Sequence, residues 1–116
     1  MKHETLHMTM LFDFYGELLT EKQREYFDLY HNEDLSLSEI AEKAHISRHG
    51  VYDIIKRAER ILIKTEQKTG IVKKWMDTKK SLDRILELAE QIEIKSNGQN
   101  AEITNELISI IKKTNT

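Results

Sequence analysis

The residues of this sequence best suited to chemistry are polar, basic and aromatic side chains gathered near its middle. They are Ser47, Arg48, His49, Tyr52, Lys56, Arg57, Arg60 and Lys64. Several of the lysines and arginines, continuing to Lys68, are four residues apart, so on a helix they would form one stripe. Such cations neutralise phosphates, and an arginine can also donate two hydrogen bonds to a guanine edge. The group therefore predicts a nucleic-acid-binding surface.

Other groupings of reactive residues predict no chemistry. His3, Glu4 and His7 match the H-E-x-x-H pattern of zinc sites, but they lie where a chain end frays and no cleft encloses an ion. His45 and His49 have the same spacing without the glutamate. The chain has no cysteine, no serine in a glycine-flanked elbow and no phosphate-binding glycine loop. We therefore expect no catalytic residues, no metal, no cofactor and no enzymatic activity.

The charge of the chain is unevenly distributed. The 116 residues carry a net charge of −2. Residues 1–47 contribute −6, residues 48–84 contribute +6 and residues 85–116 contribute −2. A basic block between acidic ends is typical of a local surface that binds a polyanion.

Helices must position these side chains. Proline is absent and only four glycines are present, which favours an all-α fold. Apolar residues three and four apart predict a first helix over residues 5–19. Thr20 with Gln23 and Ser36 with Glu39 have the spacing of capping boxes, so a second and a third helix are expected to begin there. The third is very short.

The next segment has the pattern of a helix-turn-helix. Ser47 is a plausible N-cap for a long fourth helix that Gly70 ends, and His45 occupies a turn position that requires a left-handed or bridge conformation. Ala41 is small where the two helices would cross closely. The apolar residues expected to pack across the turn are Ile40, Ala44, Ile46, Val51 and Ile54. Residues 36–64 are therefore predicted to form the motif.

The C-terminal third is predicted to form a helical extension. We expect a fifth helix over residues 71–94, a short sixth helix over residues 103–111 and a frayed tail over residues 112–116. This divides the chain into a core, residues 1–70, and an extension, residues 71–116. An apolar stripe on the fifth helix needs a cover and predicts a two-fold homodimer or a partner interface. It consists of Val72, Trp75, Met76, Leu82, Ile85, Leu86, Ala89 and Ile92.

Two segments resemble known families. Residues 19–62 are similar to the helix-turn-helix in the fourth region of RNA polymerase sigma factors, and residues 8–42 resemble the start of the YlxM family of small bacterial proteins. The resemblance implies a sigma-like core of about four helices. It also implies a role in the signal recognition particle pathway, with the particle's GTPase Ffh, its RNA or DNA near their genes as partners.

Two functions remain open on the sequence. The first is a nucleic-acid-binding regulator of DNA or of the particle's RNA. The alternative is a protein-interaction module that binds Ffh with a vestigial helix-turn-helix, because Asp53 in the basic surface would repel phosphate. The chain has neither an export segment nor a membrane span, so we expect a cytoplasmic protein without a membrane partner.

Overall fold

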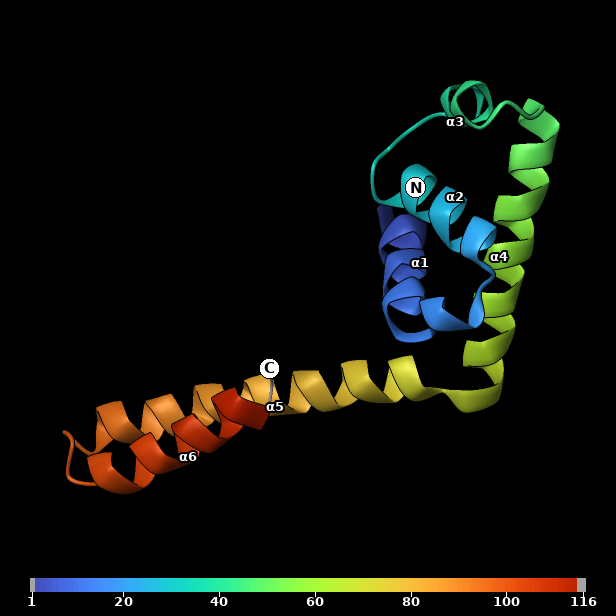
Figure 1. Cartoon of the computed structure of the whole chain (residues 1–116). Coiled ribbons are helices and arrows are strands. Elements are labelled where there is room, and N and C mark those ends of the chain that lie inside the picture. The colour runs from blue at the N-terminus through green and yellow to red at the C-terminus, as the bar shows by residue number, and fades with distance from the viewer. Residues whose placement is uncertain (1, 115–116) are drawn as a thin grey trace. The chain divides into compact units, whose positions relative to one another are not determined.

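The computed structural model describes residues 2–114, with side chains from His7 onward. All regular elements in this range are helical (Figure 1). They are α1 (Lys2–Tyr15), the 3-10 turn η1 (Gly16–Leu18), α2 (Glu21–His31), α3 (Leu37–Ala44), α4 (Arg48–Thr69), α5 (Ile71–Lys95) and α6 (Ala101–Thr114). The predicted all-α fold is confirmed.

Side-chain caps determine where α2 and α3 begin. The Thr20 hydroxyl accepts a hydrogen bond from the backbone N–H of Gln23 at 3.2 Å, and the Ser36 hydroxyl accepts one from Glu39 at 3.1 Å. Both acceptors belong to complete capping boxes, as predicted.

α1 differs from its predicted range because the chain tightens into a 3-10 turn at Gly16. This glycine is buried, and a Cβ there would lie 3.3 Å from the Phe12 ring.

The chain divides into two compact units, residues 1–72 and 73–116. The sequence placed this boundary after Gly70, but the first two residues of α5 belong to the N-terminal unit. Val72 is 1% exposed in the core of that unit, and its N–H donates to Glu66 Oε1 at 3.0 Å. Val72 is therefore a core residue, and its predicted place in an interface is wrong.

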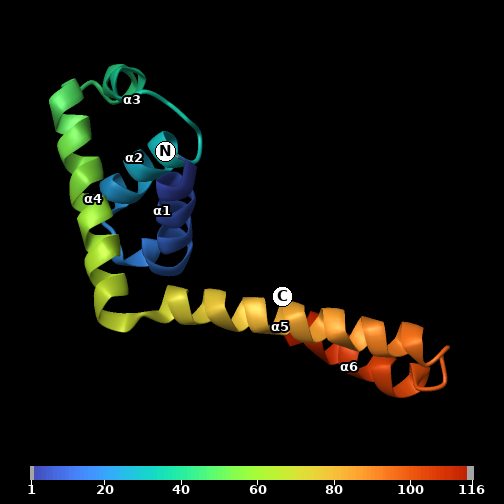
Figure 2. The same cartoon turned by 180° about the vertical axis from the view of Figure 1, so that it is seen from behind.

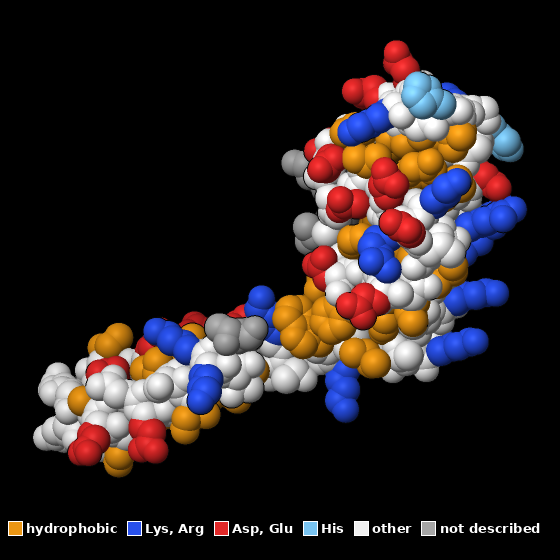
Figure 3. All heavy atoms as spheres, viewed as in Figure 1, with side chains coloured by type: hydrophobic (Ala, Val, Ile, Leu, Met, Phe, Trp, Pro, Cys, Tyr) orange, Lys and Arg blue, Asp and Glu red, His pale blue; other side chains and the backbone are white. Residues whose placement is uncertain are grey.

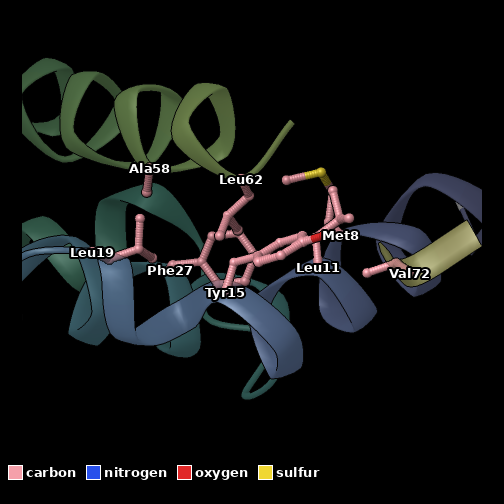
Figure 4. Packing of buried hydrophobic residues seen from close by; sticks show 8 residues of the cluster. All are labelled: Met8, Leu11, Tyr15, Leu19, Phe27, Ala58, Leu62 and Val72. Atoms are coloured by element: carbon pink, nitrogen blue, oxygen red, sulfur yellow. The ribbon is translucent and has the colours of Figure 1, made fainter. Parts of the chain in front are cut away.

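Two apolar clusters form the N-terminal unit. In the first, side chains of α1, α2 and α4 point toward one another, with Leu11, Phe27 and Leu62 fully buried (Figure 4). The second cluster attaches α3 to α2 and α4. It contains Tyr26, Ile40, Ala41, Val51 and Ile55. The two clusters together hold α4 in place. Val51 and Ile55 belong to the second cluster, and Ala58 and Leu62, farther along the helix, belong to the first.

The C-terminal unit is a helical hairpin. α5 and α6 run antiparallel and side by side, joined by residues 96–100, in which Asn97 and Gly98 have positive φ (Figures 1 and 2). α6 continues to Thr114, so a frayed tail is wrong for residues 112–114, while residues 115–116 lie outside the described range. Lys112 and Lys113 in the last turn favour this continuation, because cations stabilise the negative end of a helix.

Not all of the predicted interface stripe on α5 is exposed. Ala89 is 1% exposed, and Leu82 and Leu86 are half-buried. Ala89 is therefore also wrongly predicted as an interface residue, because it is already buried. The exposed members are Trp75, Met76, Ile85 and Ile92. No helix in the described part of the chain has the length and apolar character needed to cross a membrane.

Candidate nucleic-acid interface

A sharp turn between α3 and α4 positions the candidate site. His45 has φ 59° and ψ 38°, which is the left-handed one of the two conformations that the sequence left open. Its N–H and that of Ile46 both donate to the Ala41 carbonyl, which ends α3. Ser47 then caps α4 by accepting a hydrogen bond from the Gly50 N–H at 3.0 Å. Three residues therefore separate the two helices, and α4 starts at a fixed place.

Apolar packing holds α4, the second helix of the motif, against α3, the first. Ile40 and Val51 are fully buried, and Ala41 is 8% exposed among them. Ile46, which was predicted to pack between the helices, is instead 39% exposed. It follows the left-handed residue, and its Cδ1 lies near the first turn of α4, 3.7 Å from where a Cβ on Gly50 would stand. Of the five residues predicted to pack across the turn, Ile46 is therefore the one that remains largely in solvent.

All eight predicted binding residues lie on α4 or at its N-cap. The exposed ones are Ser47, Arg48, His49, Tyr52, Arg57, Arg60 and Lys64, whereas Lys56 is half-buried. Lysine and arginine side chains stand along the outer side of α4 (Figure 3). Near its N-terminal end the rings of His49 and Tyr52 stack, with centroids 6.4 Å apart. An aromatic pair therefore lies next to Arg48.

Lys56 is less available than the sequence suggested. Its Nζ lies 3.1 Å from Glu59 Oε1 and 5.6 Å from the centre of the Tyr52 ring. The hydrogen bond to Glu59 raises the pKa of Lys56 above its ordinary value. The cation is therefore already balanced by a carboxylate.

Glu59 connects this surface to α2. His31 Nε2 donates to Glu59 Oε2 at 3.0 Å, and the exposed fractions of the two side chains are only 8% and 14%. Burial raises the pKa of Glu59, but the hydrogen bonds and charges of His31 and Lys56 outweigh burial and leave this pKa below its ordinary value of 4.5. The sequence gives no local signal for this pair, because the two residues are 28 positions apart.

The two other acidic residues of α4, Asp53 and Glu66, also interact with groups of the protein. Asp53 Oδ2 lies 3.2 Å from Arg57 Nη2, so its charge is offset within the surface. Glu66 faces the core side, where it accepts hydrogen bonds from the Tyr15 hydroxyl at 2.7 Å and from the N–H of Val72. Among the side chains that the structure describes, no carboxylate forms an ion pair with the other cations of α4. These are Arg48, Arg60, Lys64 and Lys68.

Metal chemistry finds no support in the described side chains. From His7 onward, no group of three or more histidine and carboxylate residues could hold an ion. His7 is exposed on α1, while the side chains of His3 and Glu4 lie outside the described ones.

Comparison with known proteins agrees with this geometry. The model of the UPF0122 family, described as "Putative helix-turn-helix protein, YlxM / p13 like", matches residues 2–108. The chain belongs to the UPF0122 family. A UPF0122 protein of Shouchella clausii is 45% identical over 113 residues, which cover 97% of this chain and 98% of the relative. One of Caldanaerobacter subterraneus subsp. tengcongensis is 52% identical over 87 residues, 75% of this chain and 74% of the relative. The resemblance to the YlxM family is thus confirmed.

Proposed function

We propose that this UPF0122 protein is a regulator that binds nucleic acid through α4, with duplex DNA as the ligand that fits best. The observation that carries the proposal is the charge arrangement of α4. Glu59 and Glu66 face other elements and Asp53 is paired with Arg57, so the outer side of the helix is more basic than its composition suggests. A surface of this kind attracts a polyanion.

The N-terminal end of α4 would meet the bases. In a docked helix-turn-helix the first residues of the second helix contact base edges, and the flanking cations contact phosphates. Arg48 and Tyr52 occupy the base-contacting positions. Arg60 and Lys64 lie farther along, and at 1.5 Å per residue Lys64 is about 24 Å from Arg48, well beyond a major groove about 12 Å wide. The distal cations would therefore contact phosphates beside the groove.

Duplex RNA fits this geometry less well. The major groove of an A-form helix is deep and narrow, so a helix such as α4 could not enter it. The YlxM resemblance nevertheless makes the RNA of the signal recognition particle a ligand to test, along with DNA near the genes of that pathway. We place the function in the cytoplasm, in or upstream of that pathway, and without catalysis.

A second candidate function is supported by Lys56 and Asp53. Two cations of the surface are held in ion pairs, Lys56 by Glu59 and Arg57 by Asp53, and mixed charge of this kind also suits a protein partner. The partner that the YlxM resemblance implies is Ffh. On this alternative, α4 would bind protein and the helix-turn-helix would be vestigial.

A salt titration separates the two functions. Fluorescence anisotropy would measure binding of the full chain to labelled duplex DNA, to the particle's RNA and to Ffh in one buffer series. We expect duplex binding to weaken steeply with salt, with a log-log slope of about −0.9 for each phosphate contacted. Binding to Ffh alone, with little dependence on salt, would support the protein-interaction function instead.

A matched pair of double variants tests the surface itself. Replacing Arg48 and Arg60 by alanine should weaken duplex binding about tenfold or more and flatten the salt slope by about one to two. The control replaces Lys22 and Arg24, two exposed cations of α2, and changes the net charge equally. Equal losses in both variants would mean that only net charge matters, and the proposed role of α4 would be wrong.

A further inference from the structure

The hairpin of α5 and α6 has almost no core of its own. Among residues 73–114 only Ala89, Thr104 and Ile111 are buried. Two helices cannot enclose an apolar interior, and units of about 40 residues usually need a staple or a second copy to be stable. The hairpin is therefore incomplete as an isolated unit.

Each helix of the hairpin carries a line of exposed apolar residues. On α5 the line is Ile85, Leu88 and Ile92, and on α6 it is Ile103, Leu107 and Ile110. All six are large and exposed, from 39% at Leu107 to 70% at Ile103. Hydrophobic side chains also stand out from the hairpin surface in Figure 3.

The two lines lie on one face of the hairpin. The buried residues mark the side of each helix that meets the other, namely Ala89 on α5 and Thr104 with Ile111 on α6. At about 100° per residue, both lines are rotated from that side in the same sense, by roughly 40° to 130°. Because the helices are antiparallel, rotation in the same sense brings both lines to the same face. We call these six residues the hairpin face.

Charge and size indicate what the hairpin face could bind. By the same rotation, Glu87 and Glu90 fall on other sides of α5, whereas Glu106 lies at the edge of the face, beside Ile110. The six side chains leave roughly 500 Å² of apolar surface in solvent, and a standard interface buries about 800 Å² per partner, a little over half of it apolar. The face therefore has the apolar content of one side of a stable dimer.

We propose that the hairpin face binds the same face of a second copy of this chain, so that two hairpins form a four-helix bundle. One self-complementary patch covers both copies when they are related by a two-fold axis. A second copy is present whenever the chain is, whereas a transient partner would leave the hairpin without a core between encounters. The proposal does not depend on nucleic-acid binding.

A pair of variants two residues apart tests the face. Light scattering after size exclusion should give the full chain twice its 13.7 kDa mass. Ile92→Glu places a charge in the face, and we expect the dissociation constant of the dimer to rise about 100-fold or more, because each copy would bury an unpaired carboxylate. Ile94→Glu is the control, since Ile94 is 75% exposed on another side of α5. This variant should remain dimeric.

Cysteine cross-linking gives a second measurement that does not require a destabilising charge. The chain has no cysteine, so each variant carries a single thiol. Leu88→Cys, in the middle of the face, should oxidise to a disulfide-linked dimer, whereas Ile94→Cys should not. A full-length chain that stays monomeric at its highest soluble concentration would overturn the proposal. Equal effects of the changes at Ile92 and Ile94, or equal cross-linking of the two cysteines, would do the same.

Discussion

A single carboxylate, that of Glu59, joins the candidate interface to the core. It accepts hydrogen bonds from His31 on α2 and from Lys56 on its own helix, while only 14% of its side chain is exposed. A buried carboxylate that kept its charge without these donors would be costly. The same contacts that neutralise Lys56 therefore hold α4 against α2.

The stability that Glu59 contributes should depend on pH. Its pKa is lower in the folded chain than the ordinary 4.5, so its contribution is fully present above about pH 4.5 and is lost as the pH falls through the folded value. We expect Glu59→Gln to lower the free energy of unfolding by about 1–2 kcal/mol at pH 7. Urea unfolding at several pH values would measure this difference. It should shrink below about pH 4.5.

The control for this prediction is Glu42→Gln, a change at an exposed carboxylate of α3. It should change stability little at any pH. A deficit of Glu59→Gln that stayed constant down to pH 3 would mean that the charge of Glu59 is not what stabilises the contact.

At the scale of elements, local signals were predictable and distant contacts were not. Both capping boxes, the N-cap at Ser47 and the turn at His45 depend on residues three or four apart, and each was predictable from the sequence. The contacts of His31 with Glu59 and of Tyr15 with Glu66 span 28 and 51 residues. No periodicity encodes such pairs, because they depend on how whole helices pack.

The crossing of α3 and α4 should be sensitive to side-chain volume. Ala41 is 8% exposed and packs in one cluster with Val51 and Ile55. Ala41→Leu should therefore lower the free energy of unfolding by about 1–3 kcal/mol, because over-packing forces the helices apart. Chemical unfolding would measure the change. Ser38→Leu adds a larger side chain at an exposed position of α3 and should cost much less; similar losses would contradict a tight crossing.

The start of α5 should stabilise the N-terminal unit. Val72 is 1% exposed in its core, whereas its neighbour Ile71 is 50% exposed. Val72→Ala should lower the free energy of unfolding of this unit by about 2 kcal/mol, through lost burial and a small cavity. Ile71→Ala, the control, should lower it by less than half as much. Unfolding curves of the full-length variants, followed by a probe in the N-terminal unit, would test this. A larger loss for Ile71→Ala than for Val72→Ala would contradict the core position of Val72 and support its predicted place on the exposed stripe.

At the scale of the molecule, net charge is a poor guide to binding. The chain has a sequence pI of about 6.2 and is negative at neutral pH, yet lysine and arginine side chains stand along the outer side of α4. We expect retention on a heparin column at pH 8, with elution by added salt. Replacing Arg60 and Lys64 by alanine should weaken retention, whereas replacing Lys22 and Arg24 should have little effect. Equal shifts would mean that the retention is not specific to α4.

The inward and paired carboxylates of α4 also affect how the N-terminal unit would approach a ligand. Residues 1–47 carry a net charge of −6, whereas α4 carries six cations and three anions, all three of them paired or turned to other elements. Opposite charges on different helices give this unit an electric dipole. In the field of a polyanion the dipole experiences a torque, which turns α4 toward the ligand before contact. The fold would thus select the orientation of encounter as well as the contacts made after it.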